Sequence, residues 1–373
     1  MATKKKIDKP EQDSLAELIH DVLNTTAGEK VAYFLDGTDE TPIDLDNFVS
    51  TSSTDLDLKI SNRAYGGLAY GRIVEFSGLE GSGKSLLAAH IMANAQKQDG
   101  IAVLIDTESA LNEEFYRAIG LDMNREKFLY VNQVCIETIF EMIEGMITTV
   151  RSRKDTKDKP VVIVFDSIAG ASPRSELEGT HDKEGYNTDK AIILSRSLRK
   201  LTRLIAQEKI LLIMTNQLRE KMNAMPFADP YVTPGGKAVQ FHSSVRIRLT
   251  KKKTIKNSKK DVVGIEVQAK IVKNRLGPPH RIANFDIYFD RGIDDYSAWL
   301  SLMKQHKLVK RAGAWYTYTD KDGQEHKFQS TDFPEFLDKD PERKRLIYED
   351  ICDNEIMSYR TVAGEEYEKD DSD

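Results

Sequence analysis

The sequence is poor in cysteine and contains no long apolar run. Its 373 residues include two cysteines, Cys135 and Cys352, whose spacing matches neither a metal site nor a redox motif. Two isolated thiols are expected to be reduced, and the absence of a Cys/His cluster argues against structural zinc. Apolar stretches run five or six residues, whereas a membrane helix needs about 20. The first residues, Met-Ala-Thr-Lys-Lys-Lys, lead into polar sequence, so we expect no signal peptide, no membrane partner and a cytoplasmic location.

Positive charge is in slight deficit and is unevenly distributed. The net charge is −6, but Glu365–Asp373 carries six acidic residues and one lysine, or −5, which leaves −1 for the rest. This acidic tail is expected to be disordered, either competing with nucleic acid for basic surface or keeping the chain soluble. Lys251–Lys260, in contrast, holds six lysines and no acid. A solvated hairpin and a surface that faces DNA are equal interpretations of that run.

One octapeptide carries a specific chemical signal. Residues 78–85 match G-x-x-x-x-G-K-[ST] and stand between the apolar run Arg72–Ser77 and the helical run Leu86–Gln96. Glycine allows backbone angles that a Cβ would forbid, so successive N–H groups can point at phosphate oxygens beside a helix N-terminus. A glycine-rich turn without a ligand is the alternative, which the strand–helix context disfavours. We therefore expect a nucleoside triphosphate to bind along Gly78, Leu79, Glu80, Gly81, Ser82, Gly83, Lys84 and Ser85, with Lys84 at the β- and γ-phosphates and Ser85 on Mg²⁺.

The carboxylate that such a site needs for Mg²⁺ follows a buried strand. Val161–Phe165 is an uninterrupted apolar run that ends in Asp166. This pattern is typical of a central parallel strand with its carboxylate at the C-terminal edge. Asp166 is thus the predicted metal-holding residue. The alternative is an aspartate that only caps the next helix.

Two further apolar runs end in polar residues suited to the same edge. Ile101–Ile105 is followed by Asp106 and Glu108, and spacing alone makes these two equal candidates for a general base. Ile210–Met214 leads into Gln217, an uncharged group suited to sensing a γ-phosphate. Three strands that deliver polar groups to one edge predict an open α/β sheet.

The chain divides into four regions. Residues 1–45 hold an amphipathic helix, with Ser14 and Glu17 as a capping box, and the strand-like segment Val31–Leu35; this helix–strand arm is expected to dock on another subunit. Residues 46–290 form the α/β core with a central, mostly parallel sheet. Residues 291–362 form a small α+β C-terminal domain, and residues 363–373 form the tail. The stripe of the arm's helix comprises Leu15, Leu18, Ile19, Val22 and Leu23.

Several motifs together resemble the bacterial RecA recombinase family. Their order and spacing hold over about residues 48–345, whereas the arm and the tail match in character more than in letters, which suggests a divergent member. The motifs are Gly-Arg-Ile-Val-Glu before the octapeptide, Asp-Thr-Glu-Ser-Ala-Leu (106–111), Val-Phe-Asp-Ser-Ile-Ala (164–169), Asn216–Lys221, Thr-Pro-Gly-Gly-Lys-Ala (233–238), Lys273–Arg275 and Ala-Gly-Ala-Trp-Tyr (312–316).

The resemblance implies a RecA-type P-loop NTPase core and assigns roles in it. Glu108 matches the catalytic glutamate, which favours it over Asp106. Phe115 falls where the family stacks a ring on adenine, and Asn112 falls where the family usually has an acidic contact to the base. Gln217 matches the residue that senses the γ-phosphate and signals to the DNA-binding loops.

The resemblance also implies two DNA-binding loops, Glu178–Asn187 and Glu220–Gly236. The second contains Met222, Met225 and Phe227, apolar side chains able to wedge between stretched bases. Two mobile surface loops without DNA are the alternative. The predicted DNA-contacting residues are Arg219, Met222, Phe227, Gly235, Gly236 and Lys237.

Lys273 and Arg275 are assigned to the subunit interface by the same resemblance. They follow the apolar run Ile265–Val272, and strand alternation puts both side chains on one face. The family pattern implies that they contact the γ-phosphate of ATP held by a neighbouring subunit, although Arg275 stands where the bacterial pattern has a second lysine. An ordinary surface pair is the alternative.

The function implied is an ATP-dependent recombinase that forms filaments on single-stranded DNA and promotes pairing and strand exchange with double-stranded DNA. Two alternatives stay open at this point. A hexameric RecA-fold helicase would use the same phosphate chemistry in a ring, and a regulatory ATPase would switch a protein partner without touching DNA. The isolated arm and the Gly-Gly loop favour the filament.

Overall fold

The computed structural model describes residues 14–36, 39, 41, 45–179, 186–220 and 231–358. The chain forms two compact units, residues 1–44 and 45–373. The first unit contains helix α1 (Leu15–Ala27), and its predicted capping box is confirmed: the Ser14 side chain accepts from the Glu17 N–H, and the Glu17 carboxylate accepts from the Ser14 N–H. The five apolar residues of the predicted stripe are each between 49% and 74% exposed. Among the described residues of this unit, none covers this apolar face of α1.

The predicted strand at Val31–Leu35 is wrong. The segment has no strand partner in the described residues. The N–H groups of Val31 and Ala32 donate instead to Asn24 Oδ1, at 2.7 and 2.8 Å, and the N–H of Phe34 donates to Asp39 Oδ2 at 2.8 Å. Side-chain acceptors thus satisfy the backbone groups that a neighbouring strand would otherwise bind.

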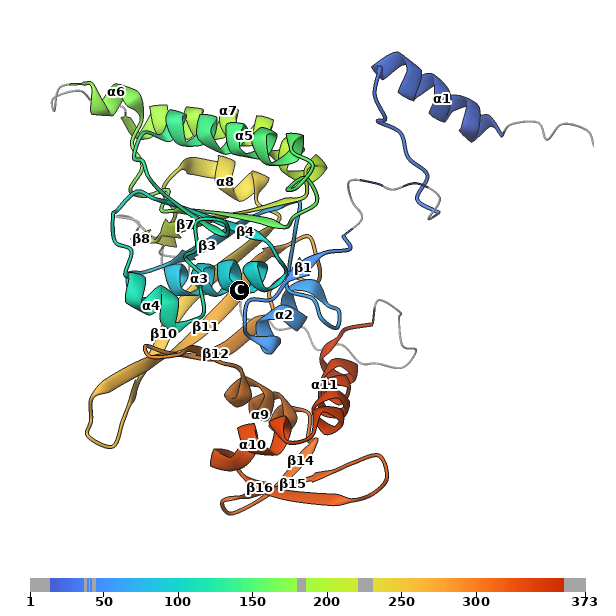
Figure 1. Ribbon diagram of the computed structural model, residues 1–373, viewed down its shortest axis with the longest axis vertical. Helices are drawn as coiled ribbons and strands as arrows, with labels where there is room; N and C mark the ends of the chain where they lie inside the picture. Colours follow the sequence, from blue (N-terminus) through green and yellow to red (C-terminus); the bar gives the residue numbers. More distant parts are fainter. Residues whose placement is uncertain are drawn as a thin grey trace, which may run out of the picture. The chain divides into compact units, whose positions relative to one another are not determined.

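The second unit is built on one sheet of nine described strands, in the order β13-β12-β11-β10-β3-β7-β6-β4-β5 (Figure 1). The six strands from β10 to β5 run parallel, and β11, β12 and β13 continue the sheet in antiparallel fashion. The strands are β3 (Arg72–Gly78), β4 (Ile101–Asp106), β5 (Phe128–Asn132), β6 (Val161–Asp166), β7 (Ile210–Gln217), β10 (Val245–Lys256), β11 (Val262–Asn274), β12 (Ile282–Tyr288) and β13 (Gly292–Asp294). The α/β fold with a mostly parallel central sheet is confirmed.

The four apolar runs that predicted strands form β3, β4, β6 and β7, which are neighbours in the sheet. Both faces of these strands are buried: Val74 and Phe76 of β3 face one hydrophobic cluster, and Ile73 faces the other. Burial on both faces explains why the runs are continuous rather than alternating. Their C-terminal ends meet at one edge, where Asp106 pairs in register with Asp166 and Gly78 with Gln217.

Helices cover both faces of the sheet (Figure 1). One cluster contains buried side chains from α2, α3 and α4, and the other contains side chains from α5, α7 and α8. Short elements complete the unit: strands β1 (Phe48–Val49), β2 (Leu68–Ala69), β8 (Arg219–Glu220) and β9 (Tyr231–Val232), and helix α6 (Arg174–Leu177). The covering helices are α2 (Thr54–Ser61), α3 (Lys84–Lys97), α4 (Glu113–Ala118), α5 (Ile136–Ser152), α7 (Tyr186–Gln207) and α8 (Gly236–His242).

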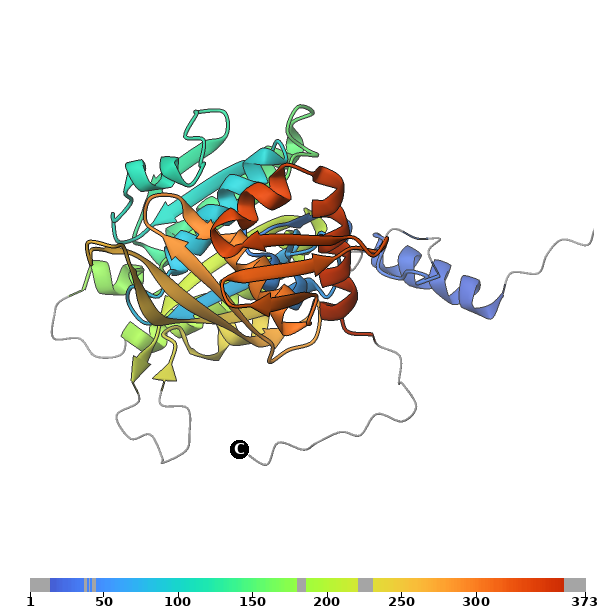
Figure 2. The ribbon, with the colours of Figure 1, turned by 90° about the horizontal axis from the view of Figure 1, so that it is seen from below.

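The C-terminal elements have a hydrophobic cluster of their own within the second unit. A three-stranded antiparallel sheet, β14-β15-β16, lies against helices (Figure 2). Glu355 of α11 connects these elements to the core, because its buried carboxylate accepts from Arg281 and lies 2.7 Å from His306 Nε2. The elements are α9 (Asp295–Gln305), β14 (Val309–Ala312), β15 (Trp315–Thr319), β16 (Glu325–Gln329), the 3₁₀ helix η1 (Ser330–Asp332), α10 (Phe333–Asp338) and α11 (Pro341–Glu355).

The lysine-rich run Lys251–Lys260 forms the end of the β10–β11 hairpin. Its lysines are exposed, and Lys253 lies 3.6 Å from Glu266 on the facing strand. A solvated hairpin is thus the local structure, and contact with DNA remains a prediction for it. The acidic tail lies outside the described residues.

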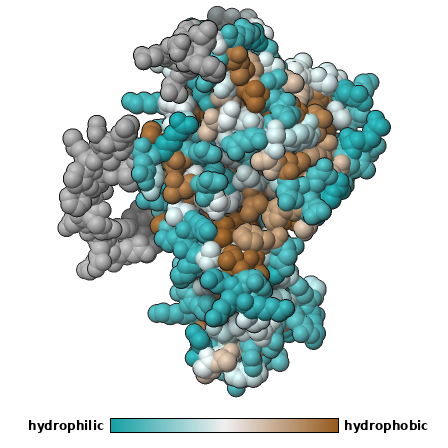
Figure 3. Space-filling view, turned by 90° about the vertical axis from the view of Figure 1, so that its left-hand side faces the viewer, coloured by the Kyte–Doolittle hydropathy of each residue, from teal (hydrophilic) through white to brown (hydrophobic). Residues whose placement is uncertain are grey.

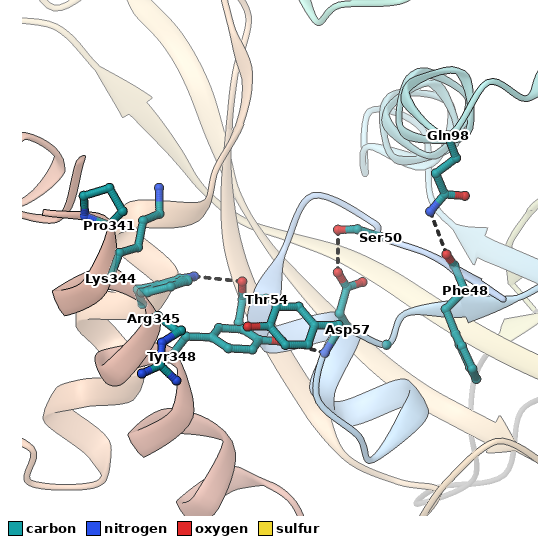
Figure 4. Close-up of a pocket in the computed structure, with 12 residues that line it drawn as sticks. Phe48, Ser50, Thr54, Asp57, Gln98, Pro341, Lys344, Arg345 and Tyr348 are labelled. Atoms are coloured by element: carbon teal, nitrogen blue, oxygen red, sulfur yellow. Dashed lines mark hydrogen bonds between the residues drawn. The ribbon is translucent and has the colours of Figure 1, made fainter. Parts of the chain in front are cut away.

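A cavity of about 470 Å³ lies between the β1–α2 segment and α11 (Figure 4). Its polar groups bond within the protein: Ser50 Oγ donates to Asp57 Oδ2 at 2.5 Å, and Gln98 Nε2 donates to the Phe48 carbonyl at 2.8 Å. Burial raises the pKa of Asp57 to about 7. This cavity shares no lining residue with the pocket at the strand ends described below.

In the described parts of the chain, every helix is too short or too polar to cross a membrane.

Candidate nucleotide-binding and catalytic site

The glycine-rich octapeptide forms the loop between β3 and α3. Gly81 and Gly83 have left-handed φ angles of 65° and 92°, and Gly83 is the N-cap of α3. Gly78 was also expected to need a backbone angle that a Cβ would forbid, but close packing is what requires glycine there. An added Cβ would lie 2.3 Å from Ser82 Oγ and 2.7 Å from the Leu249 carbonyl oxygen. Within the described residues, the buried Ser82 hydroxyl has no hydrogen-bond partner. The loop therefore presents a polar group and a helix N-terminus to an anion.

Lys84, the first residue of α3, turns its amine back onto this loop. Its Nζ donates to the carbonyls of Gly78 at 3.1 Å and Leu79 at 2.9 Å. Burial lowers the pKa of Lys84, and the nearby carboxylates of Asp166 and Glu108 oppose this shift. The amine thus lies between the loop and the carboxylates of Asp166 and Glu108. A phosphate chain bound here would have the loop on one side and these carboxylates on the other.

Ser85 and Asp166 line one small cavity of about 60 Å³ at the strand ends, together with Asp106 and Glu108. Burial raises the pKa of Asp166, whereas hydrogen bonds from Ser85 and Thr215 lower it. Thr215 Oγ1 donates to Asp166 Oδ1 at 2.5 Å. These bonds orient the partly buried carboxylate toward the cavity side of the sheet edge.

Asp106 and Glu108, which spacing could not separate, differ in their hydrogen bonding. The buried Asp106 carboxylate accepts from the N–H of Glu108 at 2.9 Å, the N–H of Ala110 at 2.9 Å and the Tyr130 hydroxyl at 3.1 Å. The exposed Glu108 accepts from Ser167 Oγ at 2.8 Å. Asp106 therefore holds the turn that carries Glu108, and Glu108 has capacity left to accept a proton.

Gln217 is the last residue of β7 and pairs in register with Gly78, the first residue of the phosphate loop. The preceding residue, Asn216, is buried and donates to Glu75 Oε1 at 3.1 Å and to the Pro234 carbonyl at 3.0 Å. The end of β7 is thereby connected to the segment that leads into α8. A movement of the Gln217 backbone can therefore reach that segment through the adjacent Asn216 and its hydrogen bond to the Pro234 carbonyl.

Phe115 lies in α4, and Asn112 directly precedes that helix. Phe115 is partly buried against the core, with an edge contact to Tyr116 at a centroid separation of 6.2 Å. Asn112 is the N-cap of this helix, and its Oδ1 accepts from the Phe115 N–H at 3.1 Å. The side chain expected to contact a base thus also caps a helix, a role that its position before Glu113 and Glu114 could have indicated.

The two predicted DNA-binding loops are described only at their bases. Residues 180–185 of the first loop and residues 221–230 of the second, which include Met222, Met225 and Phe227, lie outside the described residues. The second base is a short ribbon in which Arg219 of β8 pairs with Val232 of β9. Exposed apolar side chains, Leu177 and Val232, stand at the two bases; Figure 3 shows hydrophobic patches among hydrophilic residues on this side of the molecule.

The glycine pair that ends the second loop begins α8. Gly235 and Gly236 have left-handed φ angles of 92° and 68°, and Gly235 is the N-cap of the helix. An added Cβ at Gly235 would lie 2.7 Å from Leu194 Cδ1 of α7. Both backbone angle and close packing therefore require glycine at Gly235. Lys237 follows on the exposed surface.

Arg275 lies toward the N-terminal ends of the parallel strands, away from the phosphate loop of its own chain, because its N–H donates to the Ser244 carbonyl and the N–H of Ser244 donates to the Ile73 carbonyl. Lys273 aligns through Arg246 with Glu75 in the middle of β3. Lys273 of β11 pairs with Arg246, and its Nζ donates to the carbonyls of Gln240 and Phe241 at 2.9 and 2.8 Å. Burial and the charge of Arg275 lower the pKa of Lys273 to about 8. Arg275 is exposed. Burial lowers the pKa of Arg72, the first residue of β3, and the nearby charge of Arg275 lowers it further.

The sequence did not single out Thr215, Ser167 or Tyr130, which orient the three carboxylates at the strand ends. Thr215 stands directly after an apolar run and Ser167 stands one residue further on, after Asp166, which is the one signal that could have pointed to them. No cluster of three or more metal-binding side chains occurs among the described residues. A divalent cation here would be held by a few protein oxygens.

Comparison with known proteins gives one consistent result. A family model for the RecA N-terminal domain matches residues 23–294. A protein named Protein RecA from Leifsonia xyli subsp. xyli is 39% identical over 283 residues, which cover 76% of this chain and 74% of the relative. Protein RecA from Chlamydia felis is 38% identical over 274 residues, 73% of this chain and 74% of the relative. Protein RecA from Chlamydia pneumoniae is 34% identical over 304 residues, 81% of this chain and 80% of the relative.

Proposed function

Because the chain belongs to the RecA family, we propose that it is an ATP-dependent DNA recombinase that forms filaments on single-stranded DNA and carries out homologous pairing and strand exchange. The observation that carries this proposal is the meeting of Ser85, Asp166 and Glu108 in one cavity beside the phosphate loop. Gln217, in register with the start of that loop, supplies a further group at the same edge.

ATP would lie along the loop between β3 and α3. The N–H groups at the start of α3 and the Lys84 amine are the groups that bind its phosphates. Lys84 would exchange its bonds to the carbonyls of Gly78 and Leu79 for phosphate oxygens. The buried Ser82 hydroxyl, which has no partner among the described residues, supports a ligand in this loop.

The oxygen donors at the strand ends fit Mg²⁺. Mg²⁺ prefers one or two carboxylate or hydroxyl ligands together with water and substrate phosphates, and Ser85 and Asp166 line the same cavity. Those two residues would hold the ion, which neutralises charge on the β- and γ-phosphates when bound. The hydrogen bond from Thr215 keeps the Asp166 carboxylate oriented for this role.

Glu108 is proposed to accept a proton from the attacking water. Its hydrogen bond from Ser167 fixes one carboxylate oxygen and leaves acceptor capacity on the other. Gln217 would report the presence of the γ-phosphate through its neighbour Asn216, which is bonded to the carbonyl of Pro234 at the end of the second predicted loop. This route supports coupling between hydrolysis and DNA binding.

Filament formation is supported by two exposed apolar surfaces. The first is the stripe of α1, which the first unit leaves uncovered. The second is the edge strand β5, where Leu129 is 50% exposed above an apolar pocket lined by β4, β6 and α5. A strand that pairs with a described strand on one side only, beside an apolar pocket, is suited to receive a segment of another subunit.

DNA binding would rely on contacts that tolerate any sequence. Cationic residues such as Arg219 and Lys237 bind phosphates, and apolar side chains of the second loop insert between bases, so Watson–Crick pairing between strands supplies specificity. Duplex DNA has a candidate surface in the exposed lysines of the β10–β11 hairpin. Affinity for either DNA form should fall as salt rises, because cationic contacts release counterions.

We expect electron microscopy to show helical filaments when the protein is mixed with ATP and single-stranded DNA, and expect that DNA to stimulate ATP hydrolysis. A variant that lacks residues 1–44 is the matched control, because these residues form a separate compact unit. It should bind ATP and fail to form filaments. Rings would instead favour a helicase, and the absence of both assemblies and of stimulation would favour a regulatory ATPase.

Arg275 provides a test of the subunit interface. Strand β3 has seven residues and spans about 20 Å, so Arg275, near its first residue, cannot reach the phosphate loop at its last. Arg275→Ala should therefore retain ATP binding and lose DNA-stimulated turnover. A guanidinium binds two phosphate oxygens at once, so Arg275→Lys should also lose activity.

Mixing Arg275→Ala with Lys84→Ala subunits should restore part of the turnover, because each variant supplies what the other lacks at a shared interface. Lys270→Ala, which removes an exposed cation from β11, the strand that ends just before Arg275, is the control and should keep full turnover. No gain at any mixing ratio, in filaments shown to contain both variants, would place the action of Arg275 within its own subunit.

A further inference from the structure

The fold uses only one half of the Asn112 side-chain amide. Asn112 directly precedes α4, and its Oδ1 accepts from the Phe115 N–H at 3.1 Å. A backbone N–H can only donate, so the amide atom that faces it is the oxygen and not the nitrogen. The Nδ2 group of Asn112 has no hydrogen-bond partner within the described parts of the chain. What this exposed residue offers to a ligand is therefore a donor.

The start of α4 borders the cavity at the strand ends. Leu111, directly before Asn112, and Tyr116, in the helix, both line that cavity together with Ser85 at the end of the phosphate loop. Helices α3 and α4 bury side chains in the same hydrophobic cluster, on one face of the sheet (Figure 1). The first turns of the two helices thus meet at one cavity, with Asn112 at its solvent side.

A bound nucleotide would extend toward this residue. Asn112 stands four residues after Glu108, and four residues of extended chain span at most about 14 Å. With the γ-phosphate near Glu108 and the other phosphates along the loop toward the start of α3, the base is the end of the nucleotide that lies farthest from Glu108. The segment from Glu108 to Asn112 runs along the same cavity. The base and the Asn112 amide are therefore placed at the same end of the site.

The two purines differ in what they present to a donor. Along one edge guanine has two acceptors, N7 and O6, whereas adenine has the acceptor N7 and the N6 amino donor. The Nδ2 group of Asn112 can bond to guanine at either atom. With adenine it can bond only at N7, and beside N6 two donors would face each other. A carboxylate at this position would have the opposite preference, because it only accepts.

We propose that Asn112 is a specificity-determining residue that makes the site accept triphosphates of 6-oxopurines, such as GTP, as well as or better than ATP. The proposal rests on the nucleotide site proposed above and deepens it, because it names the class of base that the site takes. The phosphate loop contacts no part of the base, so the same hydrolytic residues serve either purine.

The test measures the dissociation constants of ATP, GTP and inosine triphosphate, which has the 6-oxo group of guanine and lacks its 2-amino group. For wild type we expect both 6-oxopurines to bind between equally and about tenfold more tightly than ATP, the range of one neutral hydrogen bond. Asn112→Asp should reverse this preference and shift the ratio toward ATP by about tenfold or more, because hydrogen bonds to a charged group are stronger. Aspartate is as good an N-cap as asparagine, so α4 should be retained.

Three further variants isolate the outward-facing atom. Asn112→Ser keeps a capping oxygen and removes the donor, so the three affinities should become nearly equal. Asn124→Asp makes the same change at another exposed asparagine, whose Oδ1 accepts from the Glu126 N–H at 3.1 Å, and should leave the ratio unchanged. Glu114→Gln removes a neighbouring exposed acid that could accept from adenine, and should also leave it unchanged.

The outcomes distinguish this proposal from the proposed function. A protein that binds no triphosphate, or whose hydrolysis single-stranded DNA does not stimulate, would overturn the function itself. With both of these intact, three results would overturn the role of Asn112 alone. They are a wild-type preference for ATP over both 6-oxopurines by more than about tenfold, which exceeds one neutral hydrogen bond, an unchanged ratio in Asn112→Asp, and a shift in Glu114→Gln as large as that in Asn112→Asp.

Discussion

Lys84→Ala is expected to abolish ATP turnover and to weaken ATP binding by about 100-fold. Hydrogen bonds to a charged group contribute about 1.5–3 kcal/mol each, and the β- and γ-phosphates lose their cation in the phosphate loop. The carboxylates of Asp166 and Glu108, whose charges act on Lys84, would then face the phosphates without a positive charge between them. Repulsion from these groups adds to the loss of attraction.

The measurements are titration with a fluorescent ATP analogue and the rise of the thermal midpoint in the presence of ATP, since a ligand stabilises the folded state that binds it. Lys97→Ala is the control, because Lys97 is an exposed cation of the same helix that contacts Asn94. The free protein should be examined as well, because Lys84 also donates to two loop carbonyls. Unchanged ATP affinity in Lys84→Ala would contradict the assignment of the loop to phosphate.

Glu108→Gln is expected to bind ATP and DNA as wild type does and to hydrolyse ATP at least about 100-fold more slowly. Removing a general base typically costs 10²- to 10⁴-fold in rate, about the contribution of proton transfer. The amide is nearly isosteric with the carboxylate, and its carbonyl oxygen can still accept the hydrogen bond from Ser167 Oγ. Binding and hydrolysis should therefore separate in this variant.

Single-turnover hydrolysis and filament assembly on single-stranded DNA check this expectation. Glu113→Gln, at an exposed acid near the same site that is paired with Arg117, is the control and should leave turnover unchanged. Asp106→Asn should act differently, by lowering the thermal midpoint, because Asp106 accepts three hydrogen bonds that shape the turn. Near-normal turnover in Glu108→Gln would move the role of the base to Asp106 or to another group.

Features that depend on neighbouring residues could be predicted from the sequence. The capping box of Ser14 and Glu17 is confirmed, as are the four buried strands. The prediction of a strand was wrong at Val31–Leu35. The residue types of that segment favour a strand, but the side chains of Asn24 and Asp39 accept its backbone hydrogen bonds instead. Propensity describes what a segment can form, and the available partners decide what it does form.

The sequence by itself determined the family, the phosphate loop and the residues that end each central strand, because these signals are carried by short segments whose backbone and burial rules are local. Spacing left Asp106 and Glu108 equal and the family resemblance favoured Glu108; only the tertiary structure showed how the hydrogen bonds of the two carboxylates differ. Tyr130 and Ser167, which bond to the two carboxylates, come from other strands and turns. Parallel strands align distant segments at one edge, and the chemistry of that edge depends on which donors meet there.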